Sequence, residues 1–184
     1  NKANLVGGGG SGHAPAHAGY VGYGMLDAAV AGEVFTSPTP DQILEAIRNV
    51  KSEKGVILII KNYTGDIMNF EMAEELADME GIRIDKVIVN DDIAMEDSTY
   101  TIGRRGVAGT VFIHKITGGA AEDGLSIEEV KRIAEKAVKN TKTLGMSMGP
   151  CTVPASGKAS FHLEEDEIEM GLGIHGEPGT HKEK

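Results

Sequence analysis

Hydrophobic and polar positions follow two different periods along the first 140 residues. Residues 56–60 form an unbroken run of Val, Ile and Leu, which predicts a strand buried on both faces of a sheet. Residues 86–89 predict a second buried strand, while residues 40–50, 70–80, 111–122 and 126–140 have the spacing of amphipathic helices. This alternation predicts an α/β fold, with a layered, mostly parallel or mixed sheet and helices on both faces.

Shorter patterns suggest further elements in the same part of the chain. Residues 3–6 predict a short strand that ends in a glycine turn, and Pro15 suits the first turn of a helix. Residues 24–29 predict a short helix, and residues 33–35 a short extended segment. Ser126 and Glu129 have the spacing of a capping box, which indicates where the last of the helices begins.

The pattern changes near residue 141. Residues 143–148 suggest a strand, residues 151–154 a turn, and residues 168–174 alternate strictly between apolar and other side chains. Such alternation is typical of a half-buried strand in an antiparallel or edge position. We therefore divide the chain into an N-terminally truncated α/β domain, residues 1–142, and the start of a second, incomplete α/β subdomain, residues 143–184.

Composition and charge exclude several classes of partner. The chain has 28 acidic and 18 basic residues, for a formal net charge of -10, and it has no large cluster of Lys or Arg. We expect no nucleic-acid partner. Apolar runs are short and no secretory signal pattern is visible, so we also expect no membrane partner and a cytoplasmic location. A single cysteine and the absence of zinc-type His spacing lead us to expect no bound metal.

The glycine-rich residues 7–13 are the first candidate for binding chemistry. Without Cβ atoms, these residues leave backbone N–H groups open to a ligand, although a merely flexible loop is the plainer interpretation. A phosphate-binding P-loop is excluded because no Lys follows the last glycine. Gly7, Gly9 and Gly12 match the dinucleotide pattern, and Glu33 lies near the expected ribose-binding distance, so a dinucleotide site stays open as a minor alternative.

Ligands in open α/β sheets bind beyond the carboxyl ends of the strands. Residues 7–13, 61–66 and 90–92 occupy this position in the predicted sheet, so we expect them to converge on one cleft. Asp66 has two interpretations, a carboxylate that accepts a hydroxyl proton or a cap of the following helix. Lys61 either binds a ligand or points to water. Residues 91–92, two adjacent aspartates, suit a cap and turn better than catalysis.

His175 begins a Gly- and Pro-rich turn, residues 175–179, directly after the alternating segment. A lone histidine is most often structural, but this location also suits a nucleophile or base. The residues by themselves leave both interpretations open.

Six blocks of sequence carry a resemblance to a known family: GGGSGH (8–13), GEVFTSPTP (32–40), KNYTGD (61–66), GRRG (103–106), CTVP (151–154) and GLGIHGEPG (171–179). Together they closely resemble the dihydroxyacetone-binding K subunit of dihydroxyacetone kinases. The resemblance implies that residues 1–142 bind substrate, and that His175, in the second domain, holds dihydroxyacetone covalently as a hemiaminal. It also implies that Gly10, His13, Lys61 and Asp66 bind the hydroxyls, with Asp66 or His13 taking the proton of the attacking hydroxyl.

The resemblance further implies an enzyme that transfers a phosphoryl group to an alcohol. The chain itself would bind no cofactor. Mg-ADP or Mg-ATP is expected on a partner L subunit, which is recharged by a phosphotransferase-system protein or exchanges its nucleotide with ATP. A homodimer is expected as well.

One position departs from the family pattern. Ala14 follows His13, where the family motif usually continues His-Glu-Pro. The alternative to a kinase subunit is therefore a non-catalytic, dihydroxyacetone-sensing coactivator paralogue, and a dinucleotide-dependent oxidoreductase is the third hypothesis.

Overall fold

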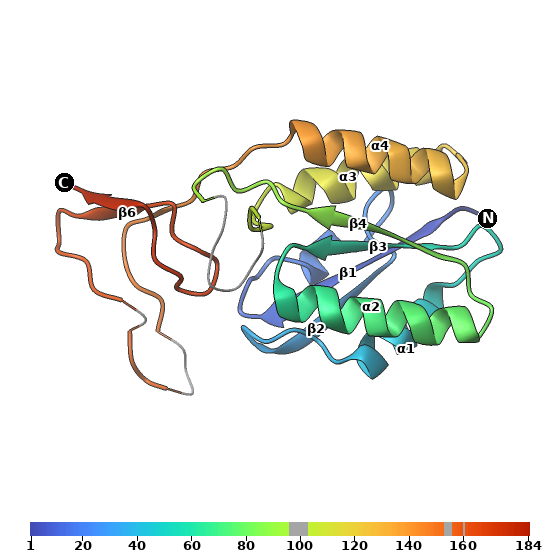
Figure 1. Ribbon diagram of the computed structural model, residues 1–184, viewed down its shortest axis with the longest axis horizontal. Helices are drawn as coiled ribbons and strands as arrows, with labels where there is room; N and C mark the ends of the chain where they lie inside the picture. Colours follow the sequence, from blue (N-terminus) through green and yellow to red (C-terminus); the bar gives the residue numbers. More distant parts are fainter. Residues whose placement is uncertain (96–102, 153–155, 160) are drawn as a thin grey trace.

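Four parallel strands form the central sheet, in the order β2-β1-β3-β4. In the computed structural model, which describes residues 1–95, 103–152, 156–159 and 161–184, helices α1 and α2 cover one face of this sheet and helices α3 and α4 cover the other (Figure 1). The elements are β1 (Asn4–Ser11), β2 (Ala28–Val34), α1 (Pro40–Val50), β3 (Val56–Lys61), α2 (Thr64–Met79), β4 (Ile84–Val89), α3 (Thr110–Glu122) and α4 (Ile127–Asn140). The predicted α/β class is confirmed.

Strand β3 lies inside the sheet and explains why its sequence is apolar throughout. Ile57 and Ile59 pack in the core under α3 and α4, whereas Leu58 and Ile60 pack in the core under α1 and α2. All the residues of β3 are buried. Burial on both faces leaves no position for a polar side chain until Lys61, the last residue of the strand.

The glycine run was predicted to be a turn, and this prediction is wrong for Gly7 to Gly10. These residues continue β1 and pair in parallel with β2. A Cβ on Gly8 would lie 2.7 Å from the Val30 carbonyl oxygen, and one on Gly10 would lie 2.5 Å from the Thr36 nitrogen. The glycines therefore allow neighbouring backbone to approach β1 closely, and the turn begins only at Gly12, which has a φ of 98°.

Two short helix predictions are also wrong. No α-helix begins at Pro15, where turns lead into a 3₁₀ helix, η1 (Ala18–Tyr20). Residues 24–29 do not form a helix, because Ala28 and Ala29 already pair with β1 as the first residues of β2. Sheet pairing with a buried neighbour outweighs the high intrinsic helix preference of alanine.

The last part of the chain forms a second, antiparallel sheet, β5-β6-β7, that extends away from the first (Figure 1). Its strands are β5 (Met146–Ser147), β6 (Ile168–Met170) and β7 (His181–Glu183). The predicted strands over 143–148 and 168–174 are thus much shorter, and β6 ends where Gly171 adopts a φ of 76°. Within the described residues after position 143 the structure has no helix.

The division at residues 142/143 stays a prediction. Thr143 is still tied to the first sheet's loops, because its backbone N–H donates to the Asp91 carbonyl. Of the predicted turn over 151–154, residues 153 and 154 lie outside the described residues. Among the residues that the structure describes, no helix combines the length and the apolar character needed to cross a membrane.

We expect Gly8→Ala to destabilise the fold by about 1–3 kcal/mol or more, because the added methyl group meets backbone of β2 that cannot move without breaking sheet pairing. Gly22→Ala is the matched control, since a Cβ on Gly22 would meet no atom within 4 Å. Urea unfolding of both variants measures the difference. Equal stability of the two variants would contradict the close-approach explanation of the glycine run.

Candidate functional site

The candidate site lies where the order of the strands in the sheet reverses. Strands β2 and β3 flank β1 on opposite sides, which makes the β1/β3 boundary a topological switch point, the usual place for a ligand in an open α/β sheet. Gly10 at the end of β1 and Lys61 at the end of β3 border a cavity of about 500 Å³ there. Its lining is Gly10, His13, Phe35, Ser37, Lys61, Tyr63, Thr64, Gly65, Asp66, His175, Gly176, Glu177 and Pro178.

All the site residues predicted from the sequence line this one cavity, namely Gly10, His13, Lys61, Asp66 and His175. His175 comes from the segment between β6 and β7 and lies over the carboxyl end of the first sheet. Its ring centroid is 4.9 Å from that of His13 and 4.9 Å from that of Tyr63, both edge-on. The structure thus brings together residues that are more than 160 positions apart in the sequence.

Asp66 lies in the first turn of α2 rather than in the predicted loop. It is not the N-cap residue, which is Tyr63. The buried Asp66 carboxylate accepts a hydrogen bond from the hydroxyl of Ser37, another residue of the cavity. Burial raises the pKa of Asp66, although the Ser37 hydrogen bond and the charge of Lys61 oppose this shift. A carboxylate whose pKa is raised is a stronger proton acceptor, as general-base catalysis requires.

Lys61 and His13 are both shifted toward their neutral forms. Burial lowers the pKa of Lys61, against the charges of Asp66, Asp91 and Glu177. Burial, with the charges of Lys61 and His175, lowers the pKa of His13 to about 4. At neutral pH the His13 ring is therefore uncharged, and its lowered pKa makes it a weaker proton acceptor than an ordinary histidine.

Glu177 is a residue of the cavity that the sequence analysis did not single out. Its carboxylate lies 2.8 Å from His175 Nδ1 and also accepts a hydrogen bond from the His175 backbone N–H. Burial alone would raise the pKa of Glu177, but these hydrogen bonds and the charge of His175 lower it to about 2. The sequence signal that could have identified Glu177 is a carboxylate two residues after a histidine in a tight turn.

Asp91 and Asp92, the adjacent aspartates after β4, do not line the cavity. Their contacts are structural, in agreement with the cap and turn that the sequence favoured over catalysis. Asp91 accepts hydrogen bonds from the backbone N–H groups of Val107 and Gly109 and from the Thr143 hydroxyl, at 2.6–2.8 Å. Asp92 lies 2.7 Å from two nitrogens of Arg105. The predicted convergence of three loops is therefore wrong for residues 90–92.

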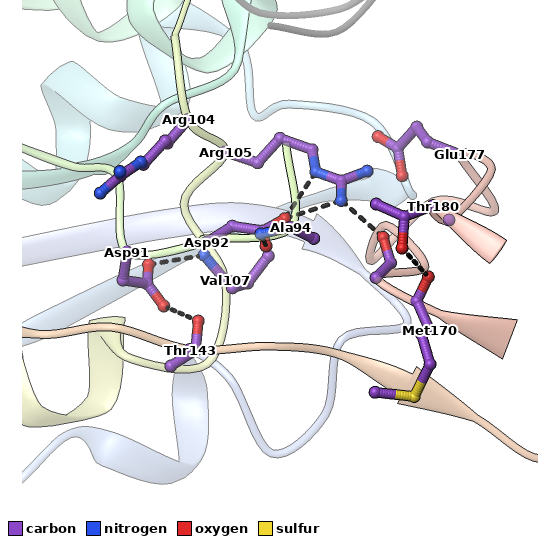
Figure 2. A network of polar contacts seen from close by, with 12 residues as sticks. Asp91, Asp92, Ala94, Arg104, Arg105, Val107, Thr143, Met170, Glu177 and Thr180 are labelled. Carbon is purple, nitrogen blue, oxygen red and sulfur yellow. Dashed lines mark hydrogen bonds and ion pairs between the residues drawn. The ribbon is translucent and has the colours of Figure 1, made fainter. Parts of the chain in front are cut away.

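Arg105 connects the two sheets. Its side chain is fully buried, and besides Asp92 it binds the carbonyl oxygen of Gly171 at 2.7 Å (Figure 2). Gly171 directly follows β6, four residues before His175. This buried contact holds the segment that carries His175 against the loops of the first sheet.

A second feature that the sequence analysis missed is a buried histidine pair on the other side of β1. His17 Nδ1 lies 3.0 Å from His114 Nε2. A Cβ on Gly9 would lie 3.3 Å from the His17 ring, and one on Gly7 would lie 3.2 Å from the His114 ring. The glycines of β1 therefore also make room for this pair, a relation that no local pattern reveals.

A larger cavity of about 770 Å³ runs along the edge strand β4 and α4. Its basic side chains include Lys86, which pairs with Glu71 and Glu74, and Lys131, which pairs with Asp85. None of the predicted site residues lines it. The smaller cavity at the switch point is therefore the candidate site. Among the described residues no cluster of His, Cys, Asp or Glu could hold a metal ion.

Comparison of the sequence with protein families matches the Dak1 domain over residues 1–184. The chain is 63% identical over 183 residues to the dihydroxyacetone-binding subunit DhaK of PTS-dependent dihydroxyacetone kinase 1 from Listeria innocua, covering 100% of this chain and 56% of that protein. It is 61% identical over 183 residues to the corresponding subunit of Lactococcus lactis, covering 100% of this chain and 55% of the relative. The chain thus spans about half the length of these relatives.

Solved structures agree with the sequence comparison. The native dihydroxyacetone kinase of C. freundii superposes with a TM-score of 0.92 at 45% identity, over 98% of this chain and 33% of that one. The same kinase in complex with AMP-PNP and Mg²⁺ gives 0.91, at the same identity and the same coverage of both chains. A dihydroxyacetone kinase operon co-activator, Dha-DhaQ, also gives 0.92 at 45% identity, over 100% of this chain and 56% of that one.

The buried histidine pair predicts a pH dependence of stability. Burial lowers the pKa of His114 from 6.5 to about 4 and that of His17 to about 2. Between pH 6.5 and 4 the unfolded chain therefore binds protons that the folded chain does not. The free energy of unfolding should fall as the pH falls, by up to about 1.4 kcal/mol per pH unit for each histidine.

The comparison of His114→Gln with the wild type isolates this effect. Urea unfolding at pH 7 and pH 5 should show a smaller loss of stability in the variant, whatever its stability at pH 7. His162→Gln is the control because the His162 side chain is 82% exposed. An unchanged pH slope in His114→Gln would refute the prediction.

Proposed function

Since this chain belongs to the Dak1 domain family, we propose that it forms the dihydroxyacetone-binding part of a dihydroxyacetone kinase. One observation carries the proposal. The cavity at the switch point combines an imidazole, His175, with several hydrogen-bonding groups, among them Lys61 and Asp66. A nucleophile facing several hydroxyl-binding groups suits a small ketone that carries two hydroxyls.

His175 supplies the covalent anchor in this proposal. An imidazole nitrogen adds to the ketone carbon and forms a hemiaminal, whereas glycerol offers no electrophilic carbon. The covalent bond thus selects ketone over alcohol. Gly10, His13, Lys61 and Asp66 bind the hydroxyls of the held substrate.

Phosphoryl transfer needs a base for the attacking terminal hydroxyl. In this proposal that base is Asp66, whose pKa is raised by burial, or His13, whose ring is uncharged at physiological pH. The nucleotide, as Mg-ADP or Mg-ATP, belongs to a partner L subunit or domain. The crystal structure of the C. freundii kinase in complex with AMP-PNP and Mg²⁺ supports this division. This chain matches only 33% of that chain, so most of that kinase lies outside the match and is available to bind the nucleotide.

The further expectations belong to the same proposal. The phosphoryl donor is ATP or a phosphotransferase-system protein, and the names of the Listeria and Lactococcus relatives favour the second. The chain works as a homodimer in the cytoplasm.

A dihydroxyacetone-sensing coactivator is the second candidate. The similarity to the co-activator Dha-DhaQ supports it, as does Ala14 at the position of the motif's Glu. Identities above 60% to kinase subunits favour the kinase. Phosphoryl transfer separates the two candidates, because a sensor would bind the ketone without turnover.

We expect the complete protein, mixed with dihydroxyacetone and examined by mass spectrometry after gentle quenching, to carry an adduct on His175. His175→Ala should abolish the adduct, because the variant lacks the nucleophilic nitrogen. His181→Ala, in the exposed strand β7, is the control and should retain it. An adduct on Lys61 instead would indicate Schiff-base chemistry and overturn the mechanism.

Asp66→Asn should separate binding from turnover. The variant should still form the adduct, but phosphoryl transfer with the partner subunit and nucleotide should fall by roughly 10²- to 10⁴-fold, the usual contribution of a general base. Asp41→Asn is the control, because Asp41 occupies the first turn of α1 but is exposed. If Asp66→Asn stays active while His13→Asn does not, the base is His13.

A further inference from the structure

The contact between Glu177 and His175 restricts the form of the histidine. Glu177 is 6% exposed, and its carboxylate is held against both the backbone N–H and the ring Nδ1 of His175. An ionised carboxylate only accepts hydrogen bonds, so the ring nitrogen that faces it must carry a hydrogen. A neutral imidazole has one N–H, so with the hydrogen on Nδ1 the lone pair is on Nε2.

The surroundings also restrict Glu177. A Cβ on Gly173 would lie 2.0 Å from Glu177 Oε2 and 2.7 Å from Arg105 Nη1, so both groups occupy the space that a side chain would fill. Gly173 N also donates to the Glu177 carbonyl oxygen at 2.9 Å. Arg105 is itself held by Asp92 and Gly171, so it limits the space into which the Glu177 carboxylate could move. The hydrogen bonds from His175 favour the ionised form of Glu177.

We propose that Glu177 is a positioning residue, which holds His175 in the Nδ1-protonated tautomer and presents the Nε2 lone pair to the substrate carbonyl carbon. This role rests on the proposed function, because it assigns the attacking atom of that reaction. It differs from a merely structural role, in which the carboxylate would only fix the turn.

The Glu177 carboxylate lies beside a ring whose charge changes when His175 adds to the ketone. The Nε2 lone pair forms the bond to the carbonyl carbon, and the π pair of the C=O bond moves to oxygen, which takes a proton from solvent. The ring is now substituted at Nε2 and protonated at Nδ1, so it carries a positive charge beside the negative Glu177. Return of the Nδ1 proton to solvent restores the original charge, and breakdown of the adduct follows the reverse path.

Glu177→Gln is the test, with Glu169→Gln as a matched control. Glu169 is also a buried carboxylate that holds this turn, 7% exposed, but it accepts a hydrogen bond from Gly179 N at 2.7 Å instead of from the histidine. The amide that Glu177→Gln introduces can donate as well as accept, so this variant no longer dictates the tautomer. Glu169→Gln perturbs the turn without changing the partner of the ring.

The measurement is ¹⁵N NMR of the complete protein labelled at histidine, with His175→Gln used to assign the His175 signals. The wild type and Glu169→Gln should show a protonated Nδ1 and an unprotonated Nε2, and Glu177→Gln should show a mixture of tautomers. The rate of dihydroxyacetone adduct formation should fall by roughly 10- to 100-fold in Glu177→Gln alone, the range found for carboxylates that orient ligating histidines.

Two results would overturn the assignment. One is a wild-type His175 with its hydrogen on Nε2, and the other is an equal loss of adduct formation in Glu177→Gln and Glu169→Gln. The tautomer is read in the free protein, so it is independent of whether dihydroxyacetone is the substrate. A wild type with the expected tautomer but no adduct would count against the proposed function while supporting the role of Glu177 in orienting the ring.

Discussion

The buried contact of Arg105 with Asp92 and Gly171 is the interaction on which the site depends. Asp92 follows β4 of the first sheet, and Gly171 follows β6 of the second. Taking a guanidinium out of water is costly, and here the Asp92 carboxylate binds Nε and Nη2 while the Gly171 carbonyl also binds Nη2. The remaining nitrogen, Nη1, is buried without a hydrogen-bond partner among the described residues. This fully buried ion pair therefore fixes where the second sheet joins the first, and with it the position of His175.

The glycines of β1 impose the second constraint, because they let three groups crowd around one strand. On one face they admit the His17 and His114 rings, and on the other they admit the backbone of residues 30–36. Ser37 follows that backbone segment and reaches Asp66. A side chain in place of one of these glycines would displace these neighbours and would reshape the wall of the cavity without touching a ligand.

Burial then determines the chemistry of the cavity. It lowers the pKa of His13 and Lys61 and raises the pKa of Asp66, so burial shifts each of these groups toward its uncharged form and makes Asp66 a stronger proton acceptor. Glu177 is the exception, because hydrogen bonds from His175 outweigh its burial and lower its pKa. One ionised carboxylate hydrogen-bonded to one histidine is an arrangement that orients the ring.

The sequence by itself determined the α/β class and the long helices and strands, because periods of 3.6 and 2 residues are local and reflect burial directly. It also named five residues of the cavity, Gly10, His13, Lys61, Asp66 and His175, since motifs at the ends of strands keep their order along the chain. The roles of these residues stay predictions. Only the tertiary structure decided that Gly7 to Gly10 form strand, that Asp92 serves Arg105, and that Glu177 faces His175. These outcomes depend on which backbone lies beside a residue, and no local pattern contains that information.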